Sequence, residues 1–441
     1  MAPRLTVIGT GYLGATHAAC MAELGFEVLG VDVDEAKIAM LSAGTVPFYE
    51  PGLDEVLARA LESGRLRFTT SFEEAGAFGD VHFVCVGTPQ RADAYAADMS
   101  QVFGAVEALA PYLERPCLVV GKSTVPVGTA DQLVELLAER APAGAGAEVA
   151  WNPEFLREGF AVQDTLHPDR LVIGVTSEAA EKALREVYAP LLDEGVPMVV
   201  TDFPTAELVK VSANAFLATK ISFINAMAEV CEAAGGDVVR LAEAIGYDPR
   251  IGNRFLQAGL GFGGGCLPKD IRAFMARAGE LGVDQALTFL REVDEINHRR
   301  RARTVYLARD AVGGDFRGRT VAVLGAAFKP DSDDVRDSPA LHVAGAIHTE
   351  GGRVRVHDPK ALDNARRLFP NLEYADTVKD VVAGADVVLH LTEWRDYRDL
   401  DPEAIGALVA QRHVVDGRNA LDPALWRAAG WTYRGLGRPT A

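Results

Sequence analysis

Metal sites and disulfide frameworks depend on cysteine and histidine patterns that this sequence lacks. Its 441 residues include five cysteines, which are scattered and never form a CxxC pair, and nine histidines without an HExxH or other ligand cluster. We therefore expect no metal site and no disulfide framework. An odd number of scattered cysteines is typical of a reducing compartment, so we expect a cytoplasmic protein.

Basic residues are scarce relative to acidic ones. The chain has 44 lysines and arginines against 62 aspartates and glutamates, a net charge of −18. Proteins that bind nucleic acids or anionic membranes in general need a basic face, so this balance argues against both kinds of partner. A small anionic ligand is not excluded, because a pocket needs only a few local cations.

Long hydrophobic runs are also missing. No apolar run reaches the roughly 18 residues of a membrane span, and the N-terminus lacks the pattern of a secretory signal. Hydrophobic residues make up 49% and charged residues 24%, as in an average globular protein. The length predicts two or three domains.

Apolar runs and helical patterns alternate in the first part of the chain. The expected buried strands are 4–9, 26–32, 81–86, 117–122 and 148–151, and helical patterns between them include 14–25, 101–112 and 129–140. This alternation predicts a parallel sheet covered by helices on both faces. A long helix is then expected from about Thr205 to Cys231, ended by Gly235-Gly236.

The strand-helix alternation resumes near residue 319 and repeats features of the first part. RTVAVLGAAFKP (319–330) parallels RLTVIGTGYLG (4–14), and Asp358 stands where Asp32 stood. We predict an α/β protein with two doubly wound Rossmann-like parallel sheets joined by a central long-helix domain. The predicted domains are 1–203, 204–312 and 313–441. The basic run Arg299–Arg303 is interpreted as a solvated helix face.

The first sheet carries a dinucleotide-binding pattern. Gly9-x-Gly11-x-x-Gly14 follows a strand and opens a helix, and Asp32 ends the next strand. The glycines allow a pyrophosphate to approach the helix N-terminus, while Asp32 would accept hydrogen bonds from a ribose. The alternative is a merely tight strand-helix turn. Acidic residues beside Asp32, with no adjacent arginine, favour NAD over NADP.

The segment GLGFGGGCLPKDIRAF (259–274) carries a candidate nucleophile. Five glycines in seven positions would let the backbone approach a ligand closely. Cys266 lies just before Pro268, which can occupy the first turn of a helix. The positive helix end and Lys269 would favour the thiolate. The alternative is a small buried cysteine in a turn.

Polar residues on the long helix and after two strands are further candidates for a ligand site. Lys210 and Asn214 lie four apart on the long helix and share a face, although a satisfied core amide is the alternative for Asn214. Glu154 and Glu158 follow a strand, at the edge of a parallel sheet that faces ligands, or else they begin a capped helix. Thr124 follows another strand and faces the same edge.

These motifs together resemble the UDP-glucose/GDP-mannose dehydrogenase family over essentially the whole chain. The segments that carry the resemblance include GTGYLG (9–14), PFYEPGLDEVL (47–57), KSTVPVG (122–128), NPEFLREG (152–159), HPDRLVIG (167–174), FGGGCLPKD (262–270), FKPDSDDVRDSPA (328–340) and VVDGRN (414–419). The resemblance implies an NAD-binding domain, a central helix that builds a homodimer or larger homo-oligomer, and a UDP-binding domain. It also implies NAD-dependent four-electron oxidation of UDP-glucose to UDP-glucuronate. GDP-mannose or a UDP-hexosamine as substrate, or a nucleotide-sugar-binding protein without turnover, are the alternatives.

The resemblance also implies roles for individual residues. Cys266 matches the catalytic nucleophile, Lys210 and Asn214 the groups that stabilise charged oxygen, Asp270 and Thr124 the holders of a water, and Glu154 the carboxylate linked to thioester hydrolysis. Residues implied to contact NAD are Gly9, Gly11, Tyr12, Leu13, Gly14, Asp32, Lys37, Thr88, Thr124, Glu158, Lys269 and Arg336. Residues implied to contact the UDP-sugar are Glu154, Phe155, Leu156, Lys210, Asn214, Arg250, Gln257, Gly259, Gly261, Phe262, Gly263, Phe328, Lys329 and Arg418. Arg250 is expected to reach in from a neighbouring subunit. Residues 89–98 and Gly265 depart from the usual pattern of the family.

Overall fold

The computed structural model of the protein describes residues 2–439. These residues form two compact units. Unit 1 contains the residues up to Ala213 together with Arg272–Gly282, and unit 2 contains Asn214–Ile271 together with the residues from Val283 onward. The division into three functional domains at residues 203 and 312 stays a prediction, because compactness does not test which segment binds which ligand.

Within residues 2–439, unit 1 holds an 8-stranded sheet in the order β3-β2-β1-β4-β5-β6-β7-β8. The strands are β1 (Leu5–Ile8), β2 (Val28–Val31), β3 (Leu66–Thr69), β4 (Val81–Val84), β5 (Cys117–Gly121), β6 (Ala147–Trp151), β7 (Leu171–Gly174) and β8 (Met198–Thr201). All pairs are parallel except β6 and β7, which are antiparallel and share one register pair, Trp151 opposite Gly174. A buried apolar run indicates a strand but carries no information on its direction.

Helices cover both faces of this sheet. They are α1 (Tyr12–Glu23), α2 (Glu35–Ser42), α3 (Leu53–Glu62), α4 (Phe72–Phe78), α5 (Ser100–Leu109), α6 (Thr129–Arg140), α7 (Ala161–Leu166), α8 (Glu178–Val187) and α9 (Ala189–Asp193). Neighbouring residues of β1 show the two-sided burial: Val7 packs in the cluster that contains α1 and α3, whereas Ile8 packs in the cluster that contains α5 and α6. Continuous apolar strands therefore arise here from burial on both faces.

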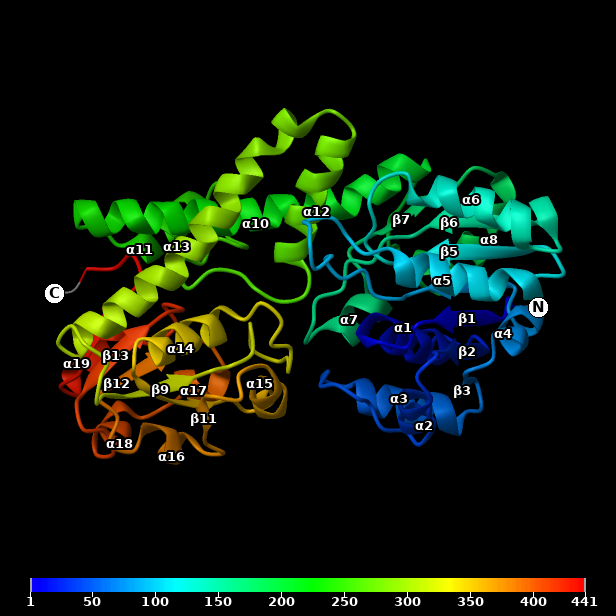
Figure 1. Ribbon diagram of the computed structural model, residues 1–441. Coiled ribbons are helices and arrows are strands. Elements are labelled where there is room, and N and C mark those ends of the chain that lie inside the picture. Colours follow the sequence, from blue (N-terminus) through cyan, green and yellow to red (C-terminus); the bar gives the residue numbers. More distant parts are fainter. Residues whose placement is uncertain (1, 440–441) are drawn as a thin grey trace. The chain divides into compact units, whose positions relative to one another are not determined.

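The long helix α10 (Phe203–Ala234) is uninterrupted, as predicted (Figure 1). It ends at Gly235, whose φ of +76° is a left-handed conformation that glycine adopts without steric cost. The helix α12 (Leu267–Glu280) begins directly after Cys266. Both helices contain a boundary between the two units.

Unit 2 holds a 6-stranded sheet in the order β11-β10-β9-β12-β13-β14 within the described residues, and every pair in it is parallel. The strands are β9 (Thr320–Leu324), β10 (Arg353–His357), β11 (Glu373–Tyr374), β12 (Val387–His390), β13 (His413–Asp416) and β14 (Thr432–Gly435). The helices are α11 (Val238–Gly246), α13 (Thr288–Ala311), α14 (Pro339–Thr349), α15 (Leu362–Leu368), α16 (Val378–Val382), α17 (Arg395–Arg398), α18 (Pro402–Gly406) and α19 (Pro423–Ala428). The predicted fold class, two Rossmann-like sheets with a long central helix, is confirmed.

The interpretation of Arg299–Arg303 as a solvated face is wrong for two of its residues. Arg300 and Arg301 on α13 are 0% and 5% exposed. Arg300 pairs with Glu232 at 3.1 Å and Arg301 with Asp337 at 2.8 Å. Carboxylates from distant segments compensate these buried charges, and a local charge pattern does not reveal such partners.

Candidate active site

The glycine pattern after β1 builds a cradle at the N-terminus of α1. A β-carbon on Gly14 would collide with the carbonyl oxygen of Gly9, so only glycine allows the helix to lie this close to the strand. At Gly11, by contrast, no heavy atom of residues 2–439 outside its chain neighbours and its own helix lies within 4 Å of the β-carbon position. The first turn of α1 has no acidic residue. The exposed amides and the helix dipole there suit the pyrophosphate of NAD.

Asp32 lies where a dinucleotide ribose would need an acceptor. Its Oδ2 accepts hydrogen bonds from Thr10 N at 2.8 Å and Lys37 Nζ at 2.9 Å, and its Oδ1 accepts one from Asp34 N at 3.1 Å. Burial alone would raise the pKa of Asp32, but Lys37 and the backbone amides lower it below its usual value. Oδ2 also accepts a hydrogen bond from Thr10 Oγ1 at 3.1 Å. The side chain is therefore an ionised carboxylate at neutral pH, and Oδ1, which accepts a single hydrogen bond from Asp34 N, keeps acceptor capacity for a ribose hydroxyl.

Glu50 supports this cradle, and the sequence interpretation did not assign it a role. It is 3% exposed and accepts hydrogen bonds from the Tyr12 hydroxyl, from Gly159 N at 2.7 Å and from Ala161 N at 2.7 Å. Glu50 thereby ties the start of α1 to the loop that carries Glu158. Its sequence signal is an acidic residue inside the otherwise apolar, proline-flanked segment PFYEP.

The loops after β4 and β5 are joined at the carboxyl edge of the first sheet. Thr88 Oγ1 donates to the carbonyl oxygen of Thr124 at 2.8 Å. Glu207 on α10 accepts hydrogen bonds from Gly128 N at 2.7 Å and Ala130 N at 2.8 Å. Glu207, which the sequence interpretation also missed, therefore anchors the loop after Thr124 to the helix that carries Lys210.

Glu154 and Lys210 form an ion pair inside unit 1. The distance between Glu154 Oε1 and Lys210 Nζ is 3.1 Å, and the two side chains are 13% and 7% exposed. Glu154 Oε2 accepts a hydrogen bond from Leu156 N at 2.6 Å, and the Phe155 ring centroid lies 5.6 Å from Lys210 Nζ. No helix begins in residues 152–160, so the interpretation as a capped helix start is wrong.

A second polar cluster joins α10 and α12 within unit 2. Asn214 Nδ2 donates to Asp270 Oδ2 at 2.6 Å, and Lys269 Nζ donates to Asp270 Oδ1 at 2.6 Å. Asp270 is 2% exposed. Cys266 lies one turn before Asp270, with Pro268 in the first turn of α12 as predicted. The Cys266 thiol is exposed, which rules out the buried-cysteine alternative.

Four of the five glycines before Cys266 are required by the protein itself: Gly259, Gly261, Gly263 and Gly264. At Gly265 the flexible Arg336 side chain could move aside for a β-carbon. The sequence predicts that these glycines give a ligand access to the backbone. In the structure, a β-carbon on any of them would press against another part of unit 2: Gly259 against Gly417 O, Gly261 against Asn297 Oδ1, Gly263 against Asp337 O, Gly264 against the Phe328 ring and Gly265 against the Arg336 guanidinium. The face of segment 259–265 on which glycine β-carbons would lie is therefore packed tightly against other residues of unit 2.

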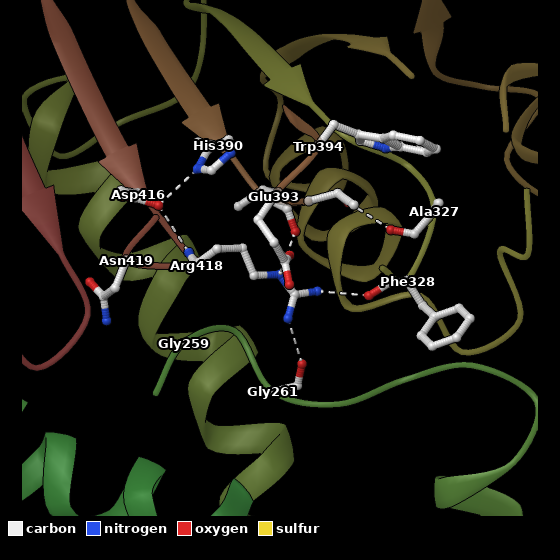
Figure 2. A network of polar contacts seen from close by, with 12 residues as sticks. Gly259, Gly261, Ala327, Phe328, His390, Glu393, Trp394, Asp416, Arg418 and Asn419 are labelled. Carbon is white, nitrogen blue, oxygen red and sulfur yellow. Dashed lines mark hydrogen bonds and ion pairs between the residues drawn. The ribbon is translucent and has the colours of Figure 1, made fainter. Parts of the chain in front are cut away.

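Arg418 connects this glycine segment to the second sheet (Figure 2). Its Nη1 donates to the carbonyl oxygen of Gly261 at 2.9 Å, and its Nη2 donates to that of Phe328 at 3.0 Å. Its Nε lies 3.2 Å from Glu393 Oε2 and donates to Leu391 O at 2.8 Å. Three residues expected at the UDP-sugar therefore lie together.

The remaining predicted residues differ in exposure and in their contacts. Arg250 pairs with Asp248 at 2.6 Å, its side chain is 87% exposed, and no hydrogen bond or ion pair within residues 2–439 joins it to the glycine segment. Gln257 is exposed and Phe262 is buried, while Leu13, Leu156 and Lys329 are half-buried. Arg336 lies in the loop before α14, where it pairs with Asp334 at 2.7 Å.

Neither a membrane span nor a metal site emerges from the described residues. Among residues 2–439, no helix has the length and apolar character needed to cross a membrane. The same residues contain no group of three or more His, Cys, Asp and Glu side chains that could hold a metal ion.

The chain matches the UDP-glucose/GDP-mannose dehydrogenase family in three consecutive segments. The NAD binding domain of the family matches residues 3–192, the central domain 204–299 and the UDP binding domain 322–423. A UDP-glucose 6-dehydrogenase of Rhizobium meliloti (strain 1021) is 42% identical over 438 residues, which cover 99% of this chain and 100% of that protein. Another UDP-glucose 6-dehydrogenase, of Bacillus subtilis (strain 168), is 40% identical over 437 residues, covering 98% and 97%.

Solved structures show the same similarity. A UDP-glucose dehydrogenase from the hyperthermophilic archaeon Pyrobaculum islandicum has a TM-score of 0.91 and 40% identity, covering 99% of this chain and 98% of that chain. A UDP-D-ManNAc dehydrogenase from Pyrococcus horikoshii has a TM-score of 0.87 and 28% identity, covering 99% and 100%.

Proposed function

This chain belongs to the UDP-glucose/GDP-mannose dehydrogenase family, and on that premise we propose that it oxidises UDP-glucose to UDP-glucuronate. It is an NAD-dependent oxidoreductase, since the NAD binding domain of the family spans residues 3–192. The observation that carries the proposal is the exposed Cys266 thiol at the start of α12, one turn before the Asn214–Asp270 hydrogen bond.

The proposed reaction converts one primary alcohol, one water and two NAD⁺ into one carboxylate, two NADH and three protons. Oxidation of the sugar C6 alcohol gives an aldehyde, and the Cys266 sulfur then bonds to the aldehyde carbon to form a thiohemiacetal. A second oxidation gives a thioester, and water displaces the thiolate to leave the carboxylate. NAD, when bound, accepts one hydride in each oxidation. The covalent link keeps the aldehyde from leaving between the two oxidations.

The residues of unit 2 suit the covalent steps. The positive end of a helix dipole stabilises the thiolate form of a cysteine at the helix N-terminus. Asp270 can hold a water through its carboxylate, and Asn214 fixes the orientation of that carboxylate through the 2.6 Å hydrogen bond. We assign Asp270 to positioning the water that takes part in proton transfer. The same role is proposed for Thr124 of unit 1 on the family resemblance alone.

Lys210 and Glu154 suit the charged steps. An ammonium group with little solvent exposure stabilises negative charge on an oxygen far better than one in water does. Glu154, 3.1 Å from Lys210, balances that charge. We assign Lys210 and Asn214 to the oxygen on the sugar carbon, and Glu154 to hydrolysis of the thioester.

We propose UDP-glucose, and not another nucleotide sugar, as the substrate because of the names of the more similar relatives. The proteins that are 40–42% identical to this chain are named UDP-glucose 6-dehydrogenases, whereas the UDP-D-ManNAc dehydrogenase of Pyrococcus horikoshii is 28% identical. Arg418, Gly261 and Phe328, which lie together in unit 2, are proposed to contact the UDP-sugar.

We also propose a homodimer formed through α10. Phe216, Phe223 and Val230 lie seven residues apart on this helix and are 67%, 49% and 57% exposed. Residues at this spacing fall on one helix face, and such an apolar stripe is typical of a helix that packs against another. Arg250, 87% exposed, is proposed to serve the active site of the partner subunit.

A panel of nucleotide sugars tests the substrate and the mechanism together. UDP-glucose at limiting concentration should yield two NADH per sugar, with UDP-glucuronate identified by mass spectrometry, while GDP-mannose and UDP-hexosamines should be far poorer substrates. Cys266→Ala should lose this overall reaction and still bind NAD. Cys266→Ser can still attack an aldehyde, but an ester hydrolyses more slowly than a thioester, so a covalent intermediate should accumulate. One NADH per sugar with released aldehyde would contradict the thioester route.

A further inference from the structure

Asn297 on α13 makes two hydrogen bonds to one residue of the glycine segment. Its side-chain Oδ1 accepts from Phe262 N at 2.8 Å, and its Nδ2 donates to Phe262 O at 2.9 Å. Asn297 is 1% exposed. A carboxamide that offers an acceptor and a donor side by side pairs with a peptide unit as a neighbouring strand does.

Asn297 also explains why its neighbour in space must be glycine. Gly261 has a φ of +99°, and a β-carbon at this residue would collide with Asn297 Oδ1. The close approach of the carboxamide and the left-handed backbone therefore each require glycine at residue 261. Without Asn297, the N–H and C=O of the buried residue Phe262 would lose partners that water cannot easily replace.

Arg301 acts one helical turn after Asn297. Its Nη2 donates to Phe262 O at 3.1 Å, and its Nη1 donates to Asp337 Oδ1 at 2.8 Å. The neighbouring Arg336 O accepts from Gly264 N at 2.9 Å. The pair Asn297–Arg301 therefore fixes Phe262 directly, and it also fixes the turn that holds Gly264.

We propose that Asn297 and Arg301 are positioning residues for sugar oxidation. They hold the backbone of Phe262, which lies between Gly261 and Gly263 and four residues before Cys266, so that the sugar-contacting segment and the nucleophile keep one geometry. This inference rests on the proposed function, because that function assigns the sugar to this segment. Neither side chain is assigned to the substrate itself.

Asn297→Ala and Asn297→Asp, with Glu295→Gln as the control, test the proposal. Glu295 lies on the same helix and is exposed. In Asn297→Ala, the amides of residues 261–265 should exchange hydrogen at least tenfold faster while the strands of unit 2 stay protected. The kcat/KM for UDP-glucose should fall at least tenfold, and the Kd for NAD should stay within twofold. Asn297→Asp keeps the acceptor for Phe262 N but sets an oxygen against Phe262 O in place of the donor, so exchange and kcat/KM should change in the same directions as in Asn297→Ala.

Two results would overturn the proposal. In the first, the amides of residues 261–265 exchange faster in Asn297→Ala, but kcat/KM stays within threefold of that of the unmodified chain. The position of this segment would then not limit the reaction. The other is loss of protection throughout unit 2, which would mean that Asn297 serves only stability. Failure of the proposed function would appear separately, as an unmodified chain that does not reduce NAD with UDP-glucose. The positioning role would then be decided by the exchange data and by calorimetry with UDP, whose affinity should still fall in Asn297→Ala.

Discussion

Asp32 and Gly11 show how single residues prepare the cradle for NAD. The carboxylate of Asp32 is oriented by Thr10, Asp34 and Lys37, and the β-carbon position of Gly11 faces space free of other described residues. A 2′-phosphate next to an ionised carboxylate would be repelled. We therefore expect selectivity for NAD over NADP to follow from the ionised Asp32 together with the acidic residues Asp34 and Glu35 beside it.

At this scale, Asp32→Asn should weaken NAD binding and reduce the preference for NAD over NADP. A hydrogen bond to a charged acceptor contributes about 1.5–3 kcal/mol, so the Kd for NAD should rise roughly 10- to 100-fold. Fluorescence titration with both cofactors measures this change. Asp54→Asn is the control, because Asp54 is an exposed carboxylate in the first turn of α3, away from Asp32 in the sequence. Equal kcat/KM with NAD and NADP in the unmodified chain would contradict the role of Asp32.

Two long helices organise the sites at the scale of secondary-structure elements. The helix α10 carries Lys210, Asn214 and the exposed apolar stripe. The helix α13 buries Asn297, Arg300 and Arg301 against unit 2. Each helix therefore buries polar or charged side chains in addition to apolar ones.

Phe223→Asp should convert the proposed dimer into monomers. Burying one phenylalanine contributes about 1.5–3 kcal/mol, and a twofold interface contains each residue twice, so the dimer should lose about 3–6 kcal/mol. Sedimentation equilibrium or light scattering over a dilution series measures this loss. Leu425→Asp on α19, where Leu425 is 53% exposed, is the control and should leave the mass unchanged. A stable dimer in Phe223→Asp would remove α10 as the interface.

The whole molecule contains two related sheets with different chemistry at corresponding positions. Asp358 follows β10 as Asp32 follows β2, but its two oxygens accept five N–H groups. These are the backbone N–H groups of Ala326, Ala327, Lys360 and Ala361 and the indole N–H of Trp394. Oδ2 accepts three of these N–H groups and Oδ1 accepts two. Each carboxylate oxygen has about two lone pairs, so neither oxygen of Asp358 keeps acceptor capacity for a ribose, whereas Oδ1 of Asp32 does. The second sheet therefore lacks an acceptor equivalent to Asp32 as well as the glycine pattern.

Sharing of active sites between subunits can be tested on mixed chains. Arg250→Ala and Cys266→Ala should each abolish turnover, the first by removing a cation that the partner needs and the second by removing the nucleophile. In a hybrid dimer, one of the two sites regains both residues, so mixing the two inactive variants should restore at most about a quarter of the activity if chains pair at random. Mass spectrometry of differently labelled chains checks that subunits exchange. No recovery despite exchange would place Arg250 in the site of its own chain.

The sequence by itself determined the features that depend on nearby residues. Four such features could be predicted: the strand-glycine-helix pattern with Asp32, the limits of α10, the helix start at Cys266 and the repeat of the sheet. They could be predicted because the spacing of apolar residues and the chemistry of turns act within about twenty residues. The residues named from family resemblance stay predictions of role, although several of them lie together, as Asn214 and Asp270 do.

Only the tertiary structure decided which distant segments meet. Asn297 and Phe262 are 35 residues apart in the chain, and Glu50 and Gly159 are 109 apart. The burial of Arg300 depends on Glu232, 68 residues before it, and a basic run looks the same whether or not such a partner exists. The antiparallel pairing of β6 with β7 was hidden for a similar reason, since strand direction is decided by the path of residues 152–170. Such contacts arise from the packing of whole elements, and a local pattern carries no record of that packing.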